Sequence, residues 1–77
     1  MTAQFVFNIP QLHLARSLLK DGIPADLMPL VISRCGASET DWQAMRDAKL
    51  VNLRAGRFRL SDEGRQEYRR QAKGRCF

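Results

Sequence analysis

The chain has 77 residues, of which 44% are hydrophobic and 27% are charged, and its formal net charge is +5 at pH 7. This length accommodates one domain near the lower size limit for a self-sufficient core, and the composition excludes a disordered tail. No apolar run is long enough to span a bilayer, and the opening MTAQFVFNIP lacks the basic start and apolar stretch of a signal peptide. We therefore expect a single cytoplasmic domain over residues 1–77 that has no membrane partner.

The cysteine and histidine content argues against a metal site or a disulfide. Cys35 and Cys76 are far apart, show no CxxC spacing and have no histidine cluster near them. A reducing cytoplasm disfavours a disulfide between them. We expect no metal and no cofactor, with Cys35 in the core and Cys76 as a free thiol on the tail.

The first predicted helix begins near Asn8 and ends at residues 20–22. Asn8, or the residue after it, can cap the helix, and Pro10 fits the first turn, where no amide hydrogen bond is needed. The helical spacing then places four apolar residues on one face: Leu12, Ala15, Leu18 and Leu19.

Two prolines limit where the second helix can begin. A start at Pro24 would place Pro29 in the helix interior at a cost of about 3 kcal/mol. Asp26 is the better cap, because Pro29 then falls in the first turn, while Ile23 and Pro24 stay extended. The expected helix ends at Gly36 and buries four residues: Leu27, Leu30, Val31 and Cys35.

The third predicted helix starts from a capping box. Ser38 and Asp41 stand at the spacing at which a serine hydroxyl and a carboxylate each satisfy an orphan amide. The inner face of this helix is then formed by Trp42, Met45 and Ala48, with the stem of Lys49 as a further candidate.

The stretch LVNLRAGRFRL, residues 50–60, predicts a β-hairpin. If Val51 pairs with Leu60 and Leu53 with Phe58, the apolar residues share one face of the hairpin. The other face carries Asn52, Arg54, Arg57 and Arg59. Like charges opposite each other are destabilising, so this face is either a solvated exterior or a surface that meets an anion.

The last predicted helix follows the hairpin directly. Ser61 can cap it, Asp62 and Glu63 favour its positive end, and Gly64 allows a close approach to the hairpin. Tyr68 and Ala72 then pack inward while the arginines of this helix face water. Whether these arginines also contact phosphates is left open by the pattern.

The positive charge is confined to the last third of the chain. Residues 1–53 carry five basic and five acidic side chains, whereas residues 54–77 carry eight basic and three acidic ones, so the whole excess lies on the hairpin and the segment after it. An asymmetry of this kind favours a polyanionic partner, although basic segments also serve as solubilising surface.

Two helices joined by a short turn, followed by a hairpin and a further helix, form an order that resembles the winged helix-turn-helix domain of bacterial and phage DNA-binding proteins. Gly36 and Ala37 match the turn, and four residues flank it at the spacing of that family: Val31, Cys35, Trp42 and Met45. Ile32 departs from the pattern, because the family favours a small residue there.

The run AKLVNLRAGRFRLSDEGR is similar to the family's passage from the recognition helix through the wing. Residues 60–65, LSDEGR, match its usual entry into the last helix, although the wing is short. The resemblance implies a mainly α fold with a small β-hairpin (α+β). Its elements are three helices, a two-stranded wing and a C-terminal helix, in one domain over residues 1–77.

The resemblance also implies a small transcriptional regulator or accessory factor that binds duplex DNA. The third helix would enter the major groove, where its outward side presents Thr40, Gln43 and Arg46 beside Glu39, Ala44 and Asp47, with Asp41 near the cap. Arg54, Arg57 and Arg59 of the wing would lie on phosphates or in a minor groove. Arg65 and Arg69 would add contacts from the last helix.

Other functions stay open at this stage. Three acidic residues on the third helix repel a DNA backbone, and they suit a protein-binding adaptor or inhibitor, such as a phage factor that docks on a host protein. RNA binding is a further alternative. A homodimer would use the first helix and the segment Phe5, Val6, Phe7, although these residues can equally be core.

Catalysis is not expected. His13 is the only histidine in the sequence, and the chain has no glycine-rich phosphate loop and no recognisable pair of catalytic carboxylates. We therefore assign no catalytic residue, and we interpret His13 as a packing or surface residue of the first helix.

Overall fold

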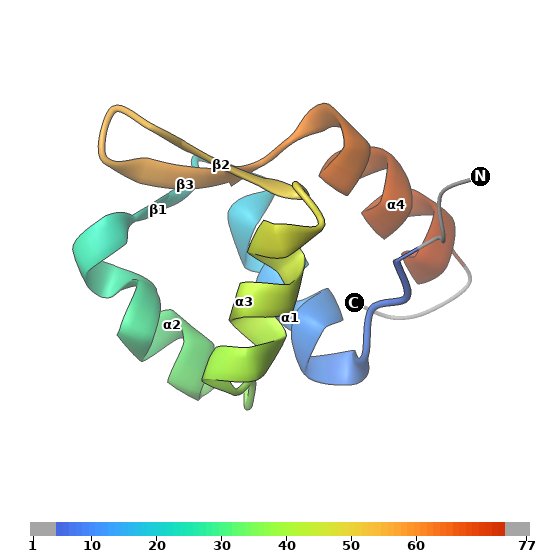
Figure 1. Ribbon diagram of the computed structural model, residues 1–77, viewed down its shortest axis with the longest axis horizontal. Coiled ribbons are helices and arrows are strands. Elements are labelled where there is room, and N and C mark those ends of the chain that lie inside the picture. The colour runs from blue at the N-terminus through green and yellow to red at the C-terminus, as the bar shows by residue number, and fades with distance from the viewer. Residues whose placement is uncertain (1–4, 74–77) are drawn as a thin grey trace.

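A three-stranded antiparallel sheet lies across one end of the helices in the computed structural model, which describes residues 5–73 (Figure 1). This described part is a mixed α+β domain with four α-helices. The elements in chain order are α1 (Ile9–Leu18), β1 (Ile23–Pro24), the 3-10 turn η1 (Ala25–Leu27), α2 (Met28–Arg34), α3 (Glu39–Asp47), β2 (Val51–Arg54), β3 (Arg57–Leu60) and α4 (Asp62–Ala72).

Helix α1 lies at the centre of the domain and begins at the predicted cap. The Asn8 side chain accepts a hydrogen bond from the Gln11 backbone at 2.8 Å, and the Gln11 side chain accepts one from the Asn8 backbone at 2.9 Å. Leu12, Ala15 and Leu18 are buried as expected, whereas Leu19 is half-buried. The helix contacts α3, α4 and β3, so Leu14 and Gln11 are also buried and its inner face is wider than the prediction.

The start of the second helix differs from the prediction. Asp26 does not cap it; Asp26 lies in η1, and α2 begins after Leu27, which supplies no side-chain cap. The cause is the preceding strand, because the Ala25 backbone donates to the carbonyl of Gly56 in the hairpin at 2.9 Å. This bond ties Ala25 to the hairpin, and α2 begins at Met28, one residue later than a cap at Asp26 would give.

The buried face of α2 also differs from the prediction. Met28 and Ile32, which are one helical turn apart, are the buried residues of this helix. Leu27 and Leu30 are 46% and 56% exposed. The run LMPLVI is apolar on every side, so its periodicity does not select one face.

The burial of three other residues of α2 and its C-terminal end also departs from the sequence prediction. Val31 and Cys35 are half-buried and pack against the edge of the core, so Cys35 is not fully a core residue. Ile32, the residue that departs from the family pattern, belongs to the core, and its carbonyl accepts a hydrogen bond from Ala37 in the turn at 3.0 Å. Cys76 lies outside the described residues.

Helix α3 begins at the predicted capping box and ends sooner than its apolar pattern indicates. Ser38 and Asp41 exchange the two expected hydrogen bonds, and Trp42 and Met45 are buried. Ala48 and Lys49 are exposed, contrary to the prediction. Lys49 has a left-handed backbone (φ 60°), which turns the chain toward the sheet and places Leu50 in the core instead.

The capping groups of α1 and α3 also bind each other. Asn8 donates from its side chain to the Asp41 carboxylate at 2.9 Å, and Gln11 donates to the Asp41 carbonyl at 2.9 Å. Gln11 is only 4% exposed, and both ends of its amide are hydrogen-bonded. Buried polar groups are tolerated when they are satisfied in this way, so this network fixes the two helix starts against each other.

The sheet has three strands, whereas the sequence predicted a two-stranded wing. The predicted register of the hairpin is confirmed, with Val51 opposite Leu60 and Leu53 opposite Phe58. The additional strand β1 pairs with β3, which gives the order β1–β3–β2. The segment Ile23–Pro24 was expected to be extended, but a two-residue strand that contains proline carries no signal for its pairing partner.

The C-terminal helix closes the core as predicted. Ser61 accepts the cap bond from the Gly64 backbone at 3.1 Å, and Tyr68 is buried. A Cβ atom on Gly64 would lie 2.2 Å from the Leu50 carbonyl oxygen, so only glycine permits this approach. None of the helices within residues 5–73 is long and apolar enough to cross a membrane.

The N-terminal segment is held on α4 by one glutamine. The side chain of Gln71 accepts from the Phe7 backbone at 2.7 Å and donates to the Phe5 carbonyl at 2.6 Å. Phe7 is buried and Phe5 packs partly on the core, with the two rings edge to face at 5.2 Å between centroids. Of the segment considered for dimerisation, Phe7 is therefore a core residue, Phe5 packs at the edge of the core, and Val6 is exposed.

Candidate nucleic-acid interface

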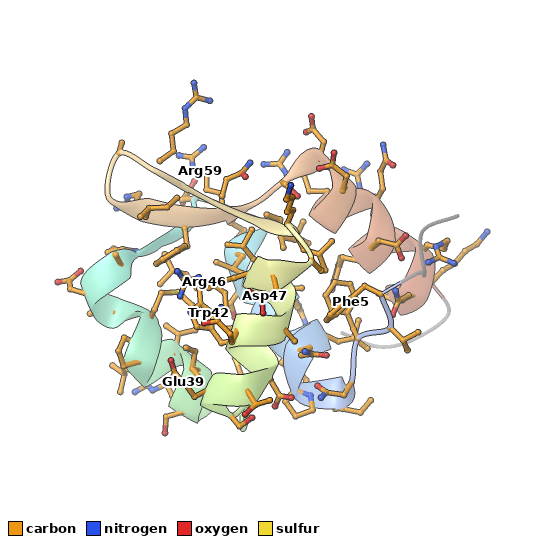
Figure 2. All side chains as sticks on the ribbon, in the orientation of Figure 1. Phe5, Glu39, Trp42, Arg46, Asp47 and Arg59 are labelled. Carbon is orange, nitrogen blue, oxygen red and sulfur yellow. The ribbon has the colours of Figure 1, made fainter. Side chains whose placement is uncertain are left out.

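The outer face of the hairpin presents three arginines in fixed cross-strand positions. Arg54 lies directly opposite Arg57, and Arg59 lies opposite Asn52. All four side chains are exposed, and Figure 2 shows Arg59 pointing away from the helices. Within residues 5–73, none of the three arginines forms an ion pair with a carboxylate. The positive charges on this face therefore have no neutralising partner in the described fold.

The loop after α1 positions two of these arginines. Arg57 donates to the carbonyl of Asp21 through Nη1 at 3.4 Å. The aliphatic part of Arg59 crosses Gly22, where an added Cβ atom would lie 2.7 Å from Arg59 Cγ. Gly22 also has a left-handed backbone (φ +78°), which favours glycine for a second reason. The sequence indicated Gly22 only as a helix end, because the pairing of β1 beside β3 was not visible in it.

An open groove of about 890 Å³ runs between this face and the first turns of α4. Asn52, Arg54 and Arg59 line it from the sheet, Lys49 from the connection after α3, and Arg65 from α4. Asp62, Glu63 and Glu67 of α4 also line it. The groove is therefore basic on the side of the sheet and mixed in charge on the side of the helix.

The charged groups of α4 are partly engaged with one another. Glu67 pairs with Arg70 and also accepts from Gln71 at 3.0 Å. The hydrogen bond from Arg70 lowers the pKa of Glu67 below its ordinary value, against the effect of burial. Arg65 is partly buried, and its Nε atom has no hydrogen-bond partner among residues 5–73. Arg69 lies one turn further along α4 and is exposed, outside the lining of the groove.

The outward side of α3 forms a different surface. Glu39, Thr40, Gln43, Ala44 and Asp47 line a shallow hollow of about 390 Å³ that shares no lining residue with the groove. Figure 2 shows Glu39 at the end of α3 that is far from the sheet. Gln43, the residue predicted to read a base, donates its amide to the Asp47 carboxylate at 2.9 Å.

Arg46 lies apart from both surfaces. Its guanidinium sits over the rings of Trp42 and Phe58, at 5.9 Å and 5.8 Å from their centroids, and these rings meet edge to face at 5.1 Å. Such a cation–π arrangement stabilises the contact between α3 and the inner face of the sheet. Arg46 is exposed, but it does not line the hollow that Thr40 and Gln43 share.

The predicted site residues accordingly fall into groups. Arg54, Arg57 and Arg59 share one face, and Arg65 faces it across the groove. Lys49 and Asn52 belong to the same surface, although the prediction did not include them as contacts. The alternation of the strand places Asn52 on this face, whereas the sequence offered the stem of Lys49 as a candidate for the inner side of α3.

Neither a protein-family model, nor a curated protein, nor a solved structure matches this chain. Among residues 5–73, no cluster of three or more histidine, cysteine, aspartate or glutamate side chains could hold a metal ion. His13 lies on the exposed side of α1.

Proposed function

We propose that this chain is a small DNA-binding protein of the winged helix-turn-helix type. It would act as a transcriptional regulator or accessory factor of bacterial or phage origin. The observation that carries the proposal is the outer face of the hairpin, where Arg54, Arg57 and Arg59 are exposed and lack an ion-pair partner within residues 5–73. Arginines held opposite each other repel, and a row of phosphates relieves this repulsion while releasing counterions from the DNA.

The order of the elements supports the same proposal. Helices α2 and α3 are joined by a short turn, the hairpin follows α3, and α4 follows the hairpin. In this arrangement α3 would approach the major groove with Thr40 and Gln43. Glu39 and Asp47 beside them can accept from cytosine, but they repel phosphates. The hairpin therefore supplies most of the affinity, and α3 contributes a preference among sequences.

A titration of a short labelled DNA duplex, followed by fluorescence anisotropy, tests the proposal. The triple variant R54Q/R57Q/R59Q should reduce the slope of log affinity against log salt by about 2 to 3 between about 50 and about 200 mM salt. The variant R16Q/K20Q/R34Q removes the same charge from exposed positions elsewhere and is the matched control. The salt slope of this control should change much less, because charges that do not contact phosphates release few counterions from the DNA.

The role of α3 is tested with the same method. Thr40→Ala and Gln43→Ala should alter which duplex is preferred and leave the salt slope nearly unchanged. Absence of any affinity for duplex DNA at about 50 mM salt, or an unchanged slope in the triple variant, would reject DNA binding through this face.

A protein-binding adaptor or inhibitor is the second candidate function. The acidic hollow on α3 favours it, because Glu39 and Asp47 are exposed beside Thr40 and Gln43. Leu27 at the end of η1 and Leu30 of α2 are also exposed, and they offer apolar surface to a protein partner. If the protein binds no duplex, a pull-down with the natural chain and with the E39Q/D47N variant should identify a protein whose capture depends on these two carboxylates.

A further inference from the structure

We propose that the groove between the hairpin and α4 binds the DNA sugar–phosphate backbone. Lys49 and Arg65 would contact phosphates there, in addition to the arginines of the hairpin. This inference rests on the proposed function and names the part of the ligand that the site takes. It assigns a binding role to Lys49, whose stem the sequence pattern offered only as a further candidate for the inner face of α3. It also predicts that affinity through this groove is largely independent of base sequence, because phosphates carry no sequence information.

Hydrogen bonds hold the backbone around Lys49, so its side chain starts from a defined place. The left-handed conformation of Lys49 ends α3, and its amide bonds the Arg46 carbonyl at 3.0 Å. Its own carbonyl accepts from the Ser61 hydroxyl at 2.8 Å, at the start of α4. The Ser61 amide in turn donates to the Leu50 carbonyl at 2.9 Å. The corner where α3, the sheet and α4 meet is therefore held by two backbone hydrogen bonds and one from the Ser61 side chain.

The cations around the groove are placed on three sides of one space. Arg54 and Arg59 rise from the sheet, Lys49 stands at the corner and Arg65 lies on α4. Residues two apart on a strand, such as Asn52 and Arg54, are separated by about 7 Å. One DNA strand advances about 3.4 Å along its axis for each phosphate. Because the strand also winds around that axis, successive phosphates are further apart than this rise, and donors two residues apart on the sheet can reach neighbouring phosphates.

The acidic groups of the groove restrict where a phosphate can lie. Asp62 and Glu63 occupy the first turn of α4, where their charges already complement the helix dipole. Glu67 is paired with Arg70. A phosphate is therefore repelled from the helix start and directed toward Lys49, Arg59 and Arg65. Removal of the two carboxylates in the first turn should strengthen DNA binding rather than weaken it.

The test uses the full chain, a short labelled duplex and three kinds of variant. K49Q/R65Q should reduce the salt slope by about 2, so that the ratio of affinities at about 50 and about 200 mM salt falls about tenfold. D62N/E63Q should raise the affinity at low salt severalfold. R16Q/R34Q is the control with the same loss of charge. The effect of K49Q/R65Q should be equal for A·T-rich and G·C-rich duplexes.

Several outcomes separate this inference from the proposed function. If R54Q/R57Q/R59Q lowers the slope while K49Q/R65Q leaves it unchanged, the groove proposal is wrong and the hairpin proposal stands. If the natural protein binds no duplex, both are wrong. Arg65 is partly buried, so K49Q alone and R65K keep the test valid if the double variant is unstable. K49Q should lower the slope by about 1, and R65K should keep it. If K49Q/R65Q lowers the salt slope for only one of the A·T-rich and G·C-rich duplexes, Lys49 or Arg65 contacts bases, and the phosphate assignment is overturned.

Discussion

The outer face of the hairpin and the outward side of α3 are both exposed, yet their polar groups are used in opposite ways. On α3, Gln43 is bonded to Asp47, and Asp41 serves the cap of its own helix and binds Asn8 and Gln11 of α1. On the hairpin, the arginines have no carboxylate partner within residues 5–73. Polar groups that are already satisfied gain little from a ligand, whereas charges that repel each other gain much. Under the proposed function, the hairpin would provide most of the affinity, whereas several polar groups of α3 are already used to support the fold.

The two surfaces are joined through the core beneath the sheet. Trp42 of α3 packs edge to face on Phe58 of β3, and Arg46 covers both rings. Figure 2 shows Arg46 beside Trp42. The position of the hairpin relative to α3 therefore depends on a few aromatic contacts. Changes there should disturb both surfaces together, whereas changes elsewhere should separate them.

The largest effect is expected from removal of this connection. Trp42 is only 3% exposed, and Trp42→Ala should lower the free energy of unfolding by about 3–5 kcal/mol. Thermal or urea unfolding followed by circular dichroism measures it. Trp42→Phe keeps a ring at this place and should cost less. Native melting behaviour in the alanine variant would show that Trp42 does not join α3 to the sheet.

A second substitution, Gly64→Ala, should affect the packing of α4 beside the groove and leave α3 in place. Gly64→Ala would place a Cβ atom 2.2 Å from the Leu50 carbonyl oxygen, so α4 must move away from the sheet. We expect a loss of stability of about 1–3 kcal/mol and a wider groove. The exposed substitution Gln66→Ala on the same helix is the control for helix propensity. Equal melting temperatures for the two variants would contradict the close approach of α4.

A third change tests whether the acidic side of α3 supports the fold. Hydrogen bonds from the Ser38 backbone and the Asn8 side chain lower the pKa of Asp41 below its ordinary value of 3.8. Ionised Asp41 therefore stabilises the fold above that pH, and this contribution is lost as the pH falls through the lowered pKa. Asp41→Asn should cost about 0.3–1 kcal/mol at neutral pH, because it removes a negative charge from the first turn of α3.

The pH dependence makes this third test specific. The difference in unfolding free energy between the natural protein and Asp41→Asn should narrow when the pH is lowered, because Asp41 itself becomes protonated. Asp26→Asn, in the exposed turn η1, is the control. A difference that stays constant from neutral to acidic pH would show that the charge of Asp41 does not support the cap.

The smallest effect concerns the repulsion on the hairpin. R54Q/R57Q/R59Q should leave the fold intact and raise the free energy of unfolding by about 0.2–1 kcal/mol, because Arg54 and Arg57 no longer repel each other. The gain should shrink as salt is added, since salt screens exposed charges. Arg69→Gln, outside the sheet, should not show this gain. Destabilisation by the triple variant would mean that these arginines contribute to the fold.

The sequence predicted the parts of this fold that depend on neighbouring residues. The caps at Asn8, Ser38 and Ser61 follow from side chains that bond amides within one turn, and the hairpin register follows from the alternation of apolar residues. The same alternation placed Arg54, Arg57 and Arg59 on one exposed face. These features need no information about the rest of the chain.

The tertiary structure decided what depends on distant contacts. The buried face of α2 could not be chosen from a run that is apolar on all sides, and the docking of the helix selected Met28 and Ile32. The pairing of Ile23–Pro24 with β3 joins residues far apart in the chain, so no local pattern reveals it. The same holds for the groove, because Lys49, Arg59 and Arg65 converge only when α4 packs through Gly64 against Leu50. Local chemistry thus determined the arginine face, and long-range packing determined which other charges stand beside it.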